Sequence, residues 1–284
     1  MPADTTSQQI ETMFSRLRRK KAAYAIPAPG TLAAKLASVV ETASSESTII
    51  DAPTLALFAT ASVEMWHRSV HSFLVSASLT KASPLWASVS GYYSSHYSIR
   101  AFAHLLGYFQ LQSRRKILQV EVNCGQYICH IHRKQGGDRE HKFYWKAVKN
   151  HARFAADPFF TKNEEGQPRS DGGHRSKANY IDHINQFPMF ETLDEVYLKA
   201  RVEKIAGVEL SDAPIPTSDS YPDTDNVQLI AYHRMVKFRK FVDEALGNTN
   251  QFWKTHRKPK WCPHFLDFQI VEPIYTGIYK EHLS

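Results

Sequence analysis

One stretch, Trp86–Gln110, limits what this chain can fold into more than any other part of its sequence. Wound as an α-helix at about 100° per residue, the stretch separates into two faces. One face is apolar and wide enough to pack into a core, and it carries Ile99, Phe102, Ala103, Leu105, Leu106 and Phe109. The other face is polar and carries Tyr93, His96, Tyr97, Arg100, His104 and Tyr108. The pattern predicts a long amphipathic helix that runs to about residue 112.

On the polar face, His96, Arg100 and His104 are spaced so that each lies one turn above the one before. Two imidazoles beside a guanidinium supply a proton acceptor, a proton donor and a cation that binds phosphate. Attack of an RNA 2′-hydroxyl on the adjacent phosphorus needs these three groups. The same face is also typical of hydrogen-bonded packing between helices. The sequence leaves both interpretations open.

Helical periodicity continues on both sides of this stretch. It predicts further helices over residues 6–24, 31–43, 54–79, 175–185, 193–206 and 227–246. Residues 142–156 fit either one helix or a strand followed by a helix, and we favour the helix. Asp51 stands near the N-cap of the helix over 54–79, and Pro53 suits the first turn of that helix.

Over residues 117–122 and 127–132, the side chains alternate in hydrophobicity with a period of two residues. This alternation predicts a β-hairpin near 116–134. We therefore expect a mainly α protein with an inserted β-hairpin. The expected domains are a basic helical arm over 1–50, a helical bundle that holds the hairpin over 51–247, and a basic, aromatic extension over 248–284.

The charge of the chain favours a polyanion as partner. The formal net charge is +7, with basic clusters at Arg16–Lys21, Arg114–Lys116 and Lys254–Lys260. Clustered basic residues attract RNA or other nucleic acids. The alternative is that these residues form an ordinary solvated surface.

No run approaches the ~18 consecutive apolar residues of a membrane span. The N-terminal residues also lack the charged-then-apolar pattern of a signal peptide. We expect a cytoplasmic protein with no membrane partner.

The cysteines are sparse and odd in number, which argues against a disulfide framework: Cys124, Cys129 and Cys262. Together with His130, His132 and His264, they supply residue types that ligate zinc. No CxxC pair is present, and Cys124 and Cys129 fall in the expected hairpin. We therefore expect no metal site and no cofactor.

The expected central helix resembles that of HEPN-domain proteins in the run Gly91-Tyr92-Tyr93, His96-Tyr97, Arg100-Ala101 and Leu105-Leu106-Gly107. Members of this family are small up-and-down α-bundles. The resemblance extends over about residues 53–247, and it implies that the helix over 54–79 and a later arginine-containing helix complete the bundle.

Many HEPN proteins are metal-independent ribonucleases of toxin and antiphage systems, and others are non-catalytic binding or assembly modules. The nuclease members carry an arginine followed, after four to six residues, by a histidine. This chain departs from that pattern, because three residues separate Arg100 from His104 and seven separate Arg175 from His183. The family's active sites often form between two bundles, so the resemblance also implies a homodimer, with an antitoxin or other protein as a further partner.

If the chain cleaves RNA, the expected catalytic residues are Arg100, His104, His96 and Arg175. The expected nucleic-acid-binding residues are Tyr93, Tyr97, Asn179, Tyr180, His183, Arg114, Arg115 and Lys116. The tyrosines among them are suited to stack on the bases of single-stranded RNA.

Two functional hypotheses follow. The first is an RNA-associated protein of a toxin or antiphage defence system that acts as a metal-independent endoribonuclease. The second is a non-catalytic binding or assembly subunit of a multiprotein complex that uses the same bundle.

Overall fold

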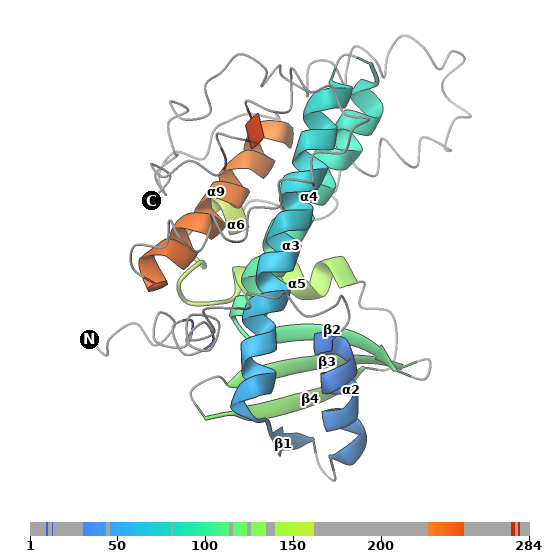
Figure 1. Cartoon of the computed structure of the whole chain (residues 1–284), viewed down its shortest axis with the longest axis vertical. Coiled ribbons are helices and arrows are strands. Elements are labelled where there is room, and N and C mark those ends of the chain that lie inside the picture. The colour runs from blue at the N-terminus through green and yellow to red at the C-terminus, as the bar shows by residue number, and fades with distance from the viewer. Residues whose placement is uncertain are drawn as a thin grey trace, which may run out of the picture. The chain divides into compact units, whose positions relative to one another are not determined.

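The computed structural model describes part of the chain, namely Ile10, Met13 and residues 31–43, 46–80, 82–113, 116–123, 126–134, 140–161, 227–246, 274–275 and 278. The chain forms two compact units. The first, here the sheet unit, comprises Met1–Met65, Ile99–His151 and Phe241–His256. The second, here the helical unit, comprises Trp66–Ser98, Ala152–Lys240 and Arg257–Ser284. Three long helices contribute residues to both units: α3 (Ala52–Leu79), α4 (Pro84–Leu105) and α9 (Val227–Leu246) (Figure 1).

The sheet unit is built on four antiparallel strands in the order β1-β4-β3-β2. The strands are β1 (Ser47–Ile49), β2 (Tyr108–Ser113), β3 (Lys116–Asn123) and β4 (Ile128–Lys134). Strands β2, β3 and β4 follow one another as a meander, and β1 pairs with the far side of β4. The pairing sets Tyr108, Glu121, His130 and Ser47 in one row across the sheet.

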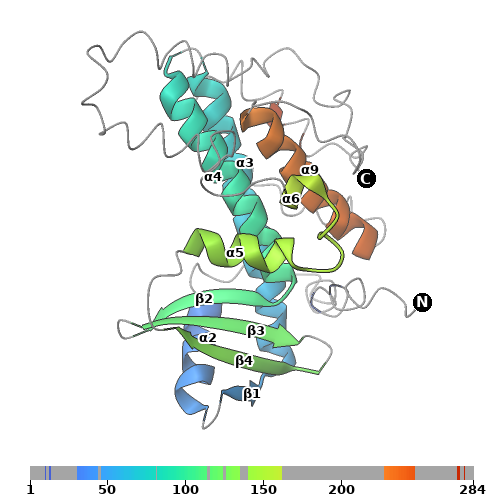
Figure 2. The ribbon, with the colours of Figure 1, turned by 180° about the vertical axis from the view of Figure 1, so that it is seen from behind.

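Successive side chains along a strand point to opposite faces of the sheet. One face is apolar and buried, with Phe109, Leu111, Val120, Val122, Cys129 and Ile131. The opposite face, here the outer face, carries Ser47, Ile49, Tyr108, Gln110, Gln119, Glu121, Ile128, His130 and His132. Figure 2 shows the outer face toward the viewer, with α2 (Thr31–Thr42) and the first half of α3 behind the strands.

The core of the sheet unit lies between the apolar face and these two helices. Helix α2 buries Leu32, Leu36 and Val40, which recur at helical spacing. The first half of α3 buries Leu55, Phe58, Ala59 and Val63. The rings of Phe58 and Phe109 meet edge to face, with centroids 6.4 Å apart.

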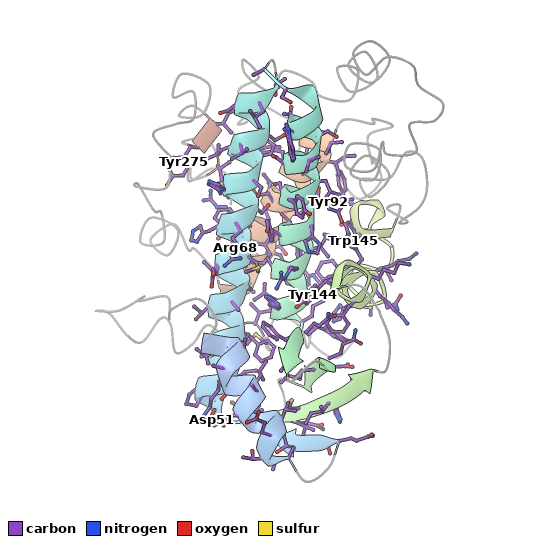
Figure 3. The ribbon with its side chains drawn as sticks, turned by 90° about the vertical axis from the view of Figure 1, so that its right-hand side faces the viewer. Asp51, Arg68, Tyr92, Tyr144, Trp145 and Tyr275 are labelled. Atoms are coloured by element: carbon purple, nitrogen blue, oxygen red, sulfur yellow. The ribbon has the colours of Figure 1, made fainter. Side chains whose placement is uncertain are left out.

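Asp51 fixes the start of α3 (Figure 3). Its side-chain Oδ1 accepts hydrogen bonds from the backbone N–H of Thr54, at 2.8 Å, and from the Thr54 hydroxyl. These bonds satisfy a backbone donor that the first turn of a helix leaves unpaired, and they lower the pKa of Asp51. The structure therefore confirms the N-cap that the sequence predicts.

The helical unit packs α3 against α4 through small hydroxyl side chains. Ser69 donates to the backbone oxygen of Ser94 at 2.7 Å, and Ser94 donates back to the backbone oxygen of Ser69 at 2.9 Å. Ser76 similarly donates to the backbone oxygen of Ala87. Because these side chains are short and their polar atoms are satisfied, the two helices approach closely.

Within the same unit, α9 runs antiparallel to α3. The indole N–H of Trp66 donates to the backbone oxygen of Met235 at 2.9 Å, and Gln228 donates to Thr80 Oγ1 at 2.8 Å near the other end of the pair. A Cβ on Gly91 would lie 2.9 Å from Val227 Cγ1, so the absence of a side chain there permits the close approach of α9 to α4.

The structure confirms a mainly α protein with an inserted β-hairpin, and it confirms the helices expected over 31–43, 54–79 and 227–246. The helix expected over 142–156 is shorter, since α5 spans Glu140–Lys149. Strand β2 lies where the sequence predicts the end of the central helix. The helices expected over 175–185 and 193–206 lie outside the described residues, as does most of the one over 6–24. The domain boundaries at 50 and 247 stay predictions.

The central helix ends earlier than the sequence predicts, at Leu105 instead of about residue 112. Gly107 has a φ of +86°, in the left-handed region that favours glycine and often ends a helix. Its carbonyl accepts the N–H of Val122 at 2.9 Å, and a Cβ at this position would lie 2.4 Å from the carbonyl oxygen of Val122. Gly107 thus turns the chain from α4 into β2. Phe109 therefore packs into the core from a strand and not from the helix.

Candidate nucleic-acid interface

His104, in the last turn of α4, is buried in the sheet unit with 1% of its surface exposed. Its Nδ1 lies 3.0 Å from the backbone oxygen of Tyr108. A carbonyl only accepts, so Nδ1 carries the proton of the neutral ring. The imidazole stacks on Phe109 at 5.0 Å between centroids and meets Tyr144 edge to face at 5.4 Å. Burial, and secondarily the charge of Arg100, lowers the pKa of His104 to about 3.

Arg100 is partly buried one turn before His104. Its guanidinium carbon lies 4.9 Å from the centroid of the Tyr144 ring, which is a cation–π contact. Tyr144 belongs to α5, and its hydroxyl accepts the backbone N–H of Gln110 at 3.0 Å (Figure 3). One side chain of α5 therefore contacts Arg100, His104 and the edge of β2.

His96 belongs to the helical unit and is 2% exposed. Its ring is parallel to that of Tyr92 within 3°, with centroids 6.3 Å apart, and it also contacts Tyr97 at 5.8 Å. Tyr93 and Tyr97 are partly exposed, with ring centroids 6.2 Å apart. His96 and His104 therefore lie in the interior, which favours the packing interpretation of this face for these two residues.

The structure does not place the remaining predicted site residues. Arg114, Arg115, Arg175, Asn179, Tyr180 and His183 lie outside the described residues. Lys116 is the first residue of β3, and only its backbone is described. The roles of these seven residues stay predictions.

The outer face of the sheet carries histidines that are accessible. His130 is exposed, and the His132 side chain is 56% exposed. Glu121 lies beside them on β3, with its side chain 46% exposed and its Oε2 3.8 Å from Nε2 of His132. Ile49, on the edge strand β1, is 79% exposed on the same face.

Tyr108 holds Glu121 in place on this face. The Tyr108 hydroxyl donates to Glu121 Oε1 at 3.0 Å. Burial and the neighbouring carboxylate raise the pKa of Tyr108 to about 12, so the hydroxyl remains a donor at neutral pH. A row of polar groups with a fixed carboxylate at its centre therefore crosses β2, β3 and β4.

Helix α5 adds positive charge beside the sheet. Lys142, Lys146 and Lys149, here the lysine stripe, follow one another at i, i+4 and i+7, so they share one side of the helix. Lys142 and Lys146 are exposed and Lys149 is partly exposed, whereas the opposite side buries Tyr144 and Val148. Contacts between α5 and β2 place this helix along the β2 edge of the sheet (Figure 2).

The sequence contained a signal for the accessible histidines. In the segment 127–132, YICHIH, apolar and histidine residues alternate. A strand with this alternation buries Cys129 and Ile131 and turns His130 and His132 to the other face. Among the described residues, no group of three or more metal-ligating side chains is arranged to hold a metal ion.

The segments that the structure describes contain no helix both long and apolar enough to cross a membrane. No protein-family model, no curated protein and no solved structure matches the chain. The function therefore has to be inferred from the site itself.

Proposed function

We propose that this chain is an RNA-associated protein that binds RNA through its sheet unit without cleaving it. The observation that carries the proposal is the lysine stripe of α5 beside an outer sheet face with exposed imidazoles. Lysines on one side of a helix form an electrostatic footprint for phosphates, and aromatic or imidazole rings stack on bases. The net charge of +7 favours the same class of partner.

A binding role is favoured over a catalytic one by the surroundings of the α4 histidines. A general base must reach the proton that it removes, and it works best with a pKa near the operating pH. His104 is enclosed by Phe109 and Tyr144, and its pKa lies near 3. His96 is also enclosed by aromatic rings. The ribonuclease activity, the toxin or defence role and the homodimer that the HEPN resemblance implies stay predictions.

The test is the salt dependence of RNA binding by the full chain. Each phosphate contact to a single strand contributes about 0.7 to the slope of log K against log salt. Replacing all three lysines of the stripe by glutamine should reduce that slope by about 2 and weaken binding at least tenfold at low salt. Lys35→Gln is the matched control, because Lys35 is exposed on α2, behind the apolar face of the sheet.

Two results would contradict this proposal. One is a triple variant with the affinity and salt slope of the unchanged protein. The other is cleavage of the RNA by the purified protein, with loss of cleavage in His104→Ala, which would favour the ribonuclease hypothesis.

A further inference from the structure

We infer that the outer face of the sheet holds the bases of a single-stranded RNA segment whose phosphates lie along the lysine stripe. The inference rests on the proposed RNA association and specifies its ligand. It follows from the spacing of the rings, the charge at the centre of the face and the position of the lysines.

The spacing of the two exposed imidazoles suits a stacked base. His130 and His132 are two residues apart on β4 and point to the same face, so their Cα atoms are about 6.7 Å apart at ~3.3–3.4 Å per residue. This is twice the rise of about 3.4 Å between stacked bases. A spacing of this size fits one unpaired base stacked between the two side chains.

The outer face also carries groups that can form hydrogen bonds with bases. Glu121 lies directly opposite His130 on the neighbouring strand, and its carboxylate is held by the Tyr108 hydroxyl. A carboxylate accepts hydrogen bonds from the amino groups of bases, and glutamate is a known reader of such donors. Gln110 and Ser47 add an amide and a hydroxyl at the two ends of the face. These groups match base edges and the ribose 2′-hydroxyl.

The separation of charges between the outer face and the stripe selects single strands over duplexes. The centre of the outer face carries the negative charge of Glu121, which repels phosphates, while the positive charge of the stripe lies on α5. A duplex presents its phosphates outward and hides its base faces. A single strand instead places its bases over the sheet while its phosphates remain at the margin.

Helix α5 is joined to the β2 edge by side-chain contacts. The rings of Phe143 and Tyr108 meet edge to face at 6.2 Å between centroids. Tyr144 accepts the backbone N–H of Gln110, so the next residue of α5 is also fixed to β2. These contacts hold the helix that carries the stripe beside the strand that carries Tyr108 and Gln110 of the outer face.

The experiment compares the affinities of the full chain for a labelled single-stranded RNA of about 12 nucleotides and for a duplex RNA with the same number of phosphates. The key variants are the double replacements His130→Ala with His132→Ala, and His130→Phe with His132→Phe. Alanine removes the rings, whereas phenylalanine keeps a stacking surface and suits a strand. Circular dichroism checks that each variant is folded.

We expect the unchanged protein to bind the single strand at least tenfold more tightly than the duplex. The alanine pair should lower single-strand affinity about tenfold or more, since stacking on each base contributes strongly. The phenylalanine pair should stay within about threefold of the unchanged protein, and neither pair should alter duplex binding.

Equal affinity for single strand and duplex, or an alanine pair that binds the single strand normally, overturns this inference and leaves the proposed RNA association intact. A phenylalanine pair that loses as much affinity as the alanine pair also overturns it. A DNA strand of the same sequence that binds as tightly as the RNA overturns the choice of RNA. Absence of binding to any nucleic acid contradicts the proposed function itself.

Discussion

Two groups of histidines in this chain have opposite surroundings. His104 lies inside the sheet unit, stacked on Phe109, with its Nδ1 bonded to the carbonyl of Tyr108. His130 and His132 project from the outer face of the same unit and are exposed. Tyr108 contacts both regions, because its carbonyl accepts from His104 while its hydroxyl donates to Glu121 on the outer face. The same residue type thus stabilises the core in one place and is available to a ligand in the other.

The difference shows that residue type and helical spacing do not by themselves make a site. The polar face of α4 has the groups that acid–base chemistry needs, yet neighbouring rings enclose its histidines. The exposed histidines lie on a strand whose alternation turns them outward. We therefore expect changes at the interior group to alter stability and changes at the exposed group to alter binding.

The largest expected effect is the response of stability to acid. The pKa of His104 is about 3 in the folded chain and 6.5 for an ordinary histidine, so below pH 6.5 the unfolded chain binds a proton that the folded chain does not. This contribution to stability is fully present above pH 6.5 and is lost as the pH falls toward 3, by up to ~1.4 kcal/mol per pH unit.

The measurement is urea unfolding over this range for the unchanged protein and for His104→Gln, which cannot titrate. The free energy of unfolding of the variant should fall less steeply as the pH is lowered. Parallel pH dependences would show that His104 is not the buried neutral group described above.

The next largest effect is the difference in stability lost when a buried and an exposed histidine are each replaced by alanine. His104→Ala removes ring contacts with Phe109 and Tyr144 and leaves the Tyr108 carbonyl without its donor, so it should lower the free energy of unfolding by about 3 kcal/mol. His130→Ala should change it by less than about 0.5 kcal/mol, because that side chain is exposed. Urea unfolding at neutral pH measures the stability of both variants. Equal losses of stability in the two variants would contradict the distinction between the buried and the exposed histidines.

A similar contrast is expected between lysines. In the helical unit, Lys237 lies 2.6 Å from Asp157 Oδ2 and 5.0 Å from the centroid of the Phe159 ring. Because this pair is mostly buried, Lys237→Ala should cost about 2 kcal/mol. Lys146→Ala, in the exposed stripe, should change stability by less than about 0.5 kcal/mol. Thermal unfolding of the two variants provides the test, and a destabilised Lys146→Ala protein would mean that the stripe is structural.

The smallest expected effect concerns the hydroxyl that joins α5 to β2. Tyr144→Phe removes the acceptor for the Gln110 N–H but keeps the ring beneath Arg100, so it should cost about 1 kcal/mol. Hydrogen exchange of the Gln110 amide should become faster, since the group loses its partner. An amide that stays equally protected would show that another group bonds to this edge of the sheet.

Much of the fold follows from local pattern. Helix α3 has apolar residues at helical spacing and an Asp51 cap, and the hairpin has a period of two. The end of α4 was harder to predict, because the residues after Leu105 fit an apolar helical face as well as a strand. The helix ends and the strand begins because Gly107 has a left-handed backbone conformation and lies close to Val122 on β3. That contact joins residues distant in the sequence, which local pattern does not reveal.

The site was less predictable than the fold for the same reason. Periodicity assigned His104 to a polar helix face, but the ring of Tyr144 that covers it comes from α5, after the whole sheet. The orientation of His130 and His132 follows from alternation once Cys129 and Ile131 are recognised as core residues. Which face of a sheet remains open depends on where α2 and α3 pack, and that is a tertiary property.

The most direct test of this account is a map of where single-stranded RNA touches the full chain. The RNA carries a photoreactive thio-uridine, and crosslinked peptides are identified by mass spectrometry after irradiation. We predict crosslinks in β2, β4 and α5, at or near Tyr108, His132 and Lys146. Crosslinks concentrated on α4 around His96 and Arg100, with none on the sheet, would contradict the account.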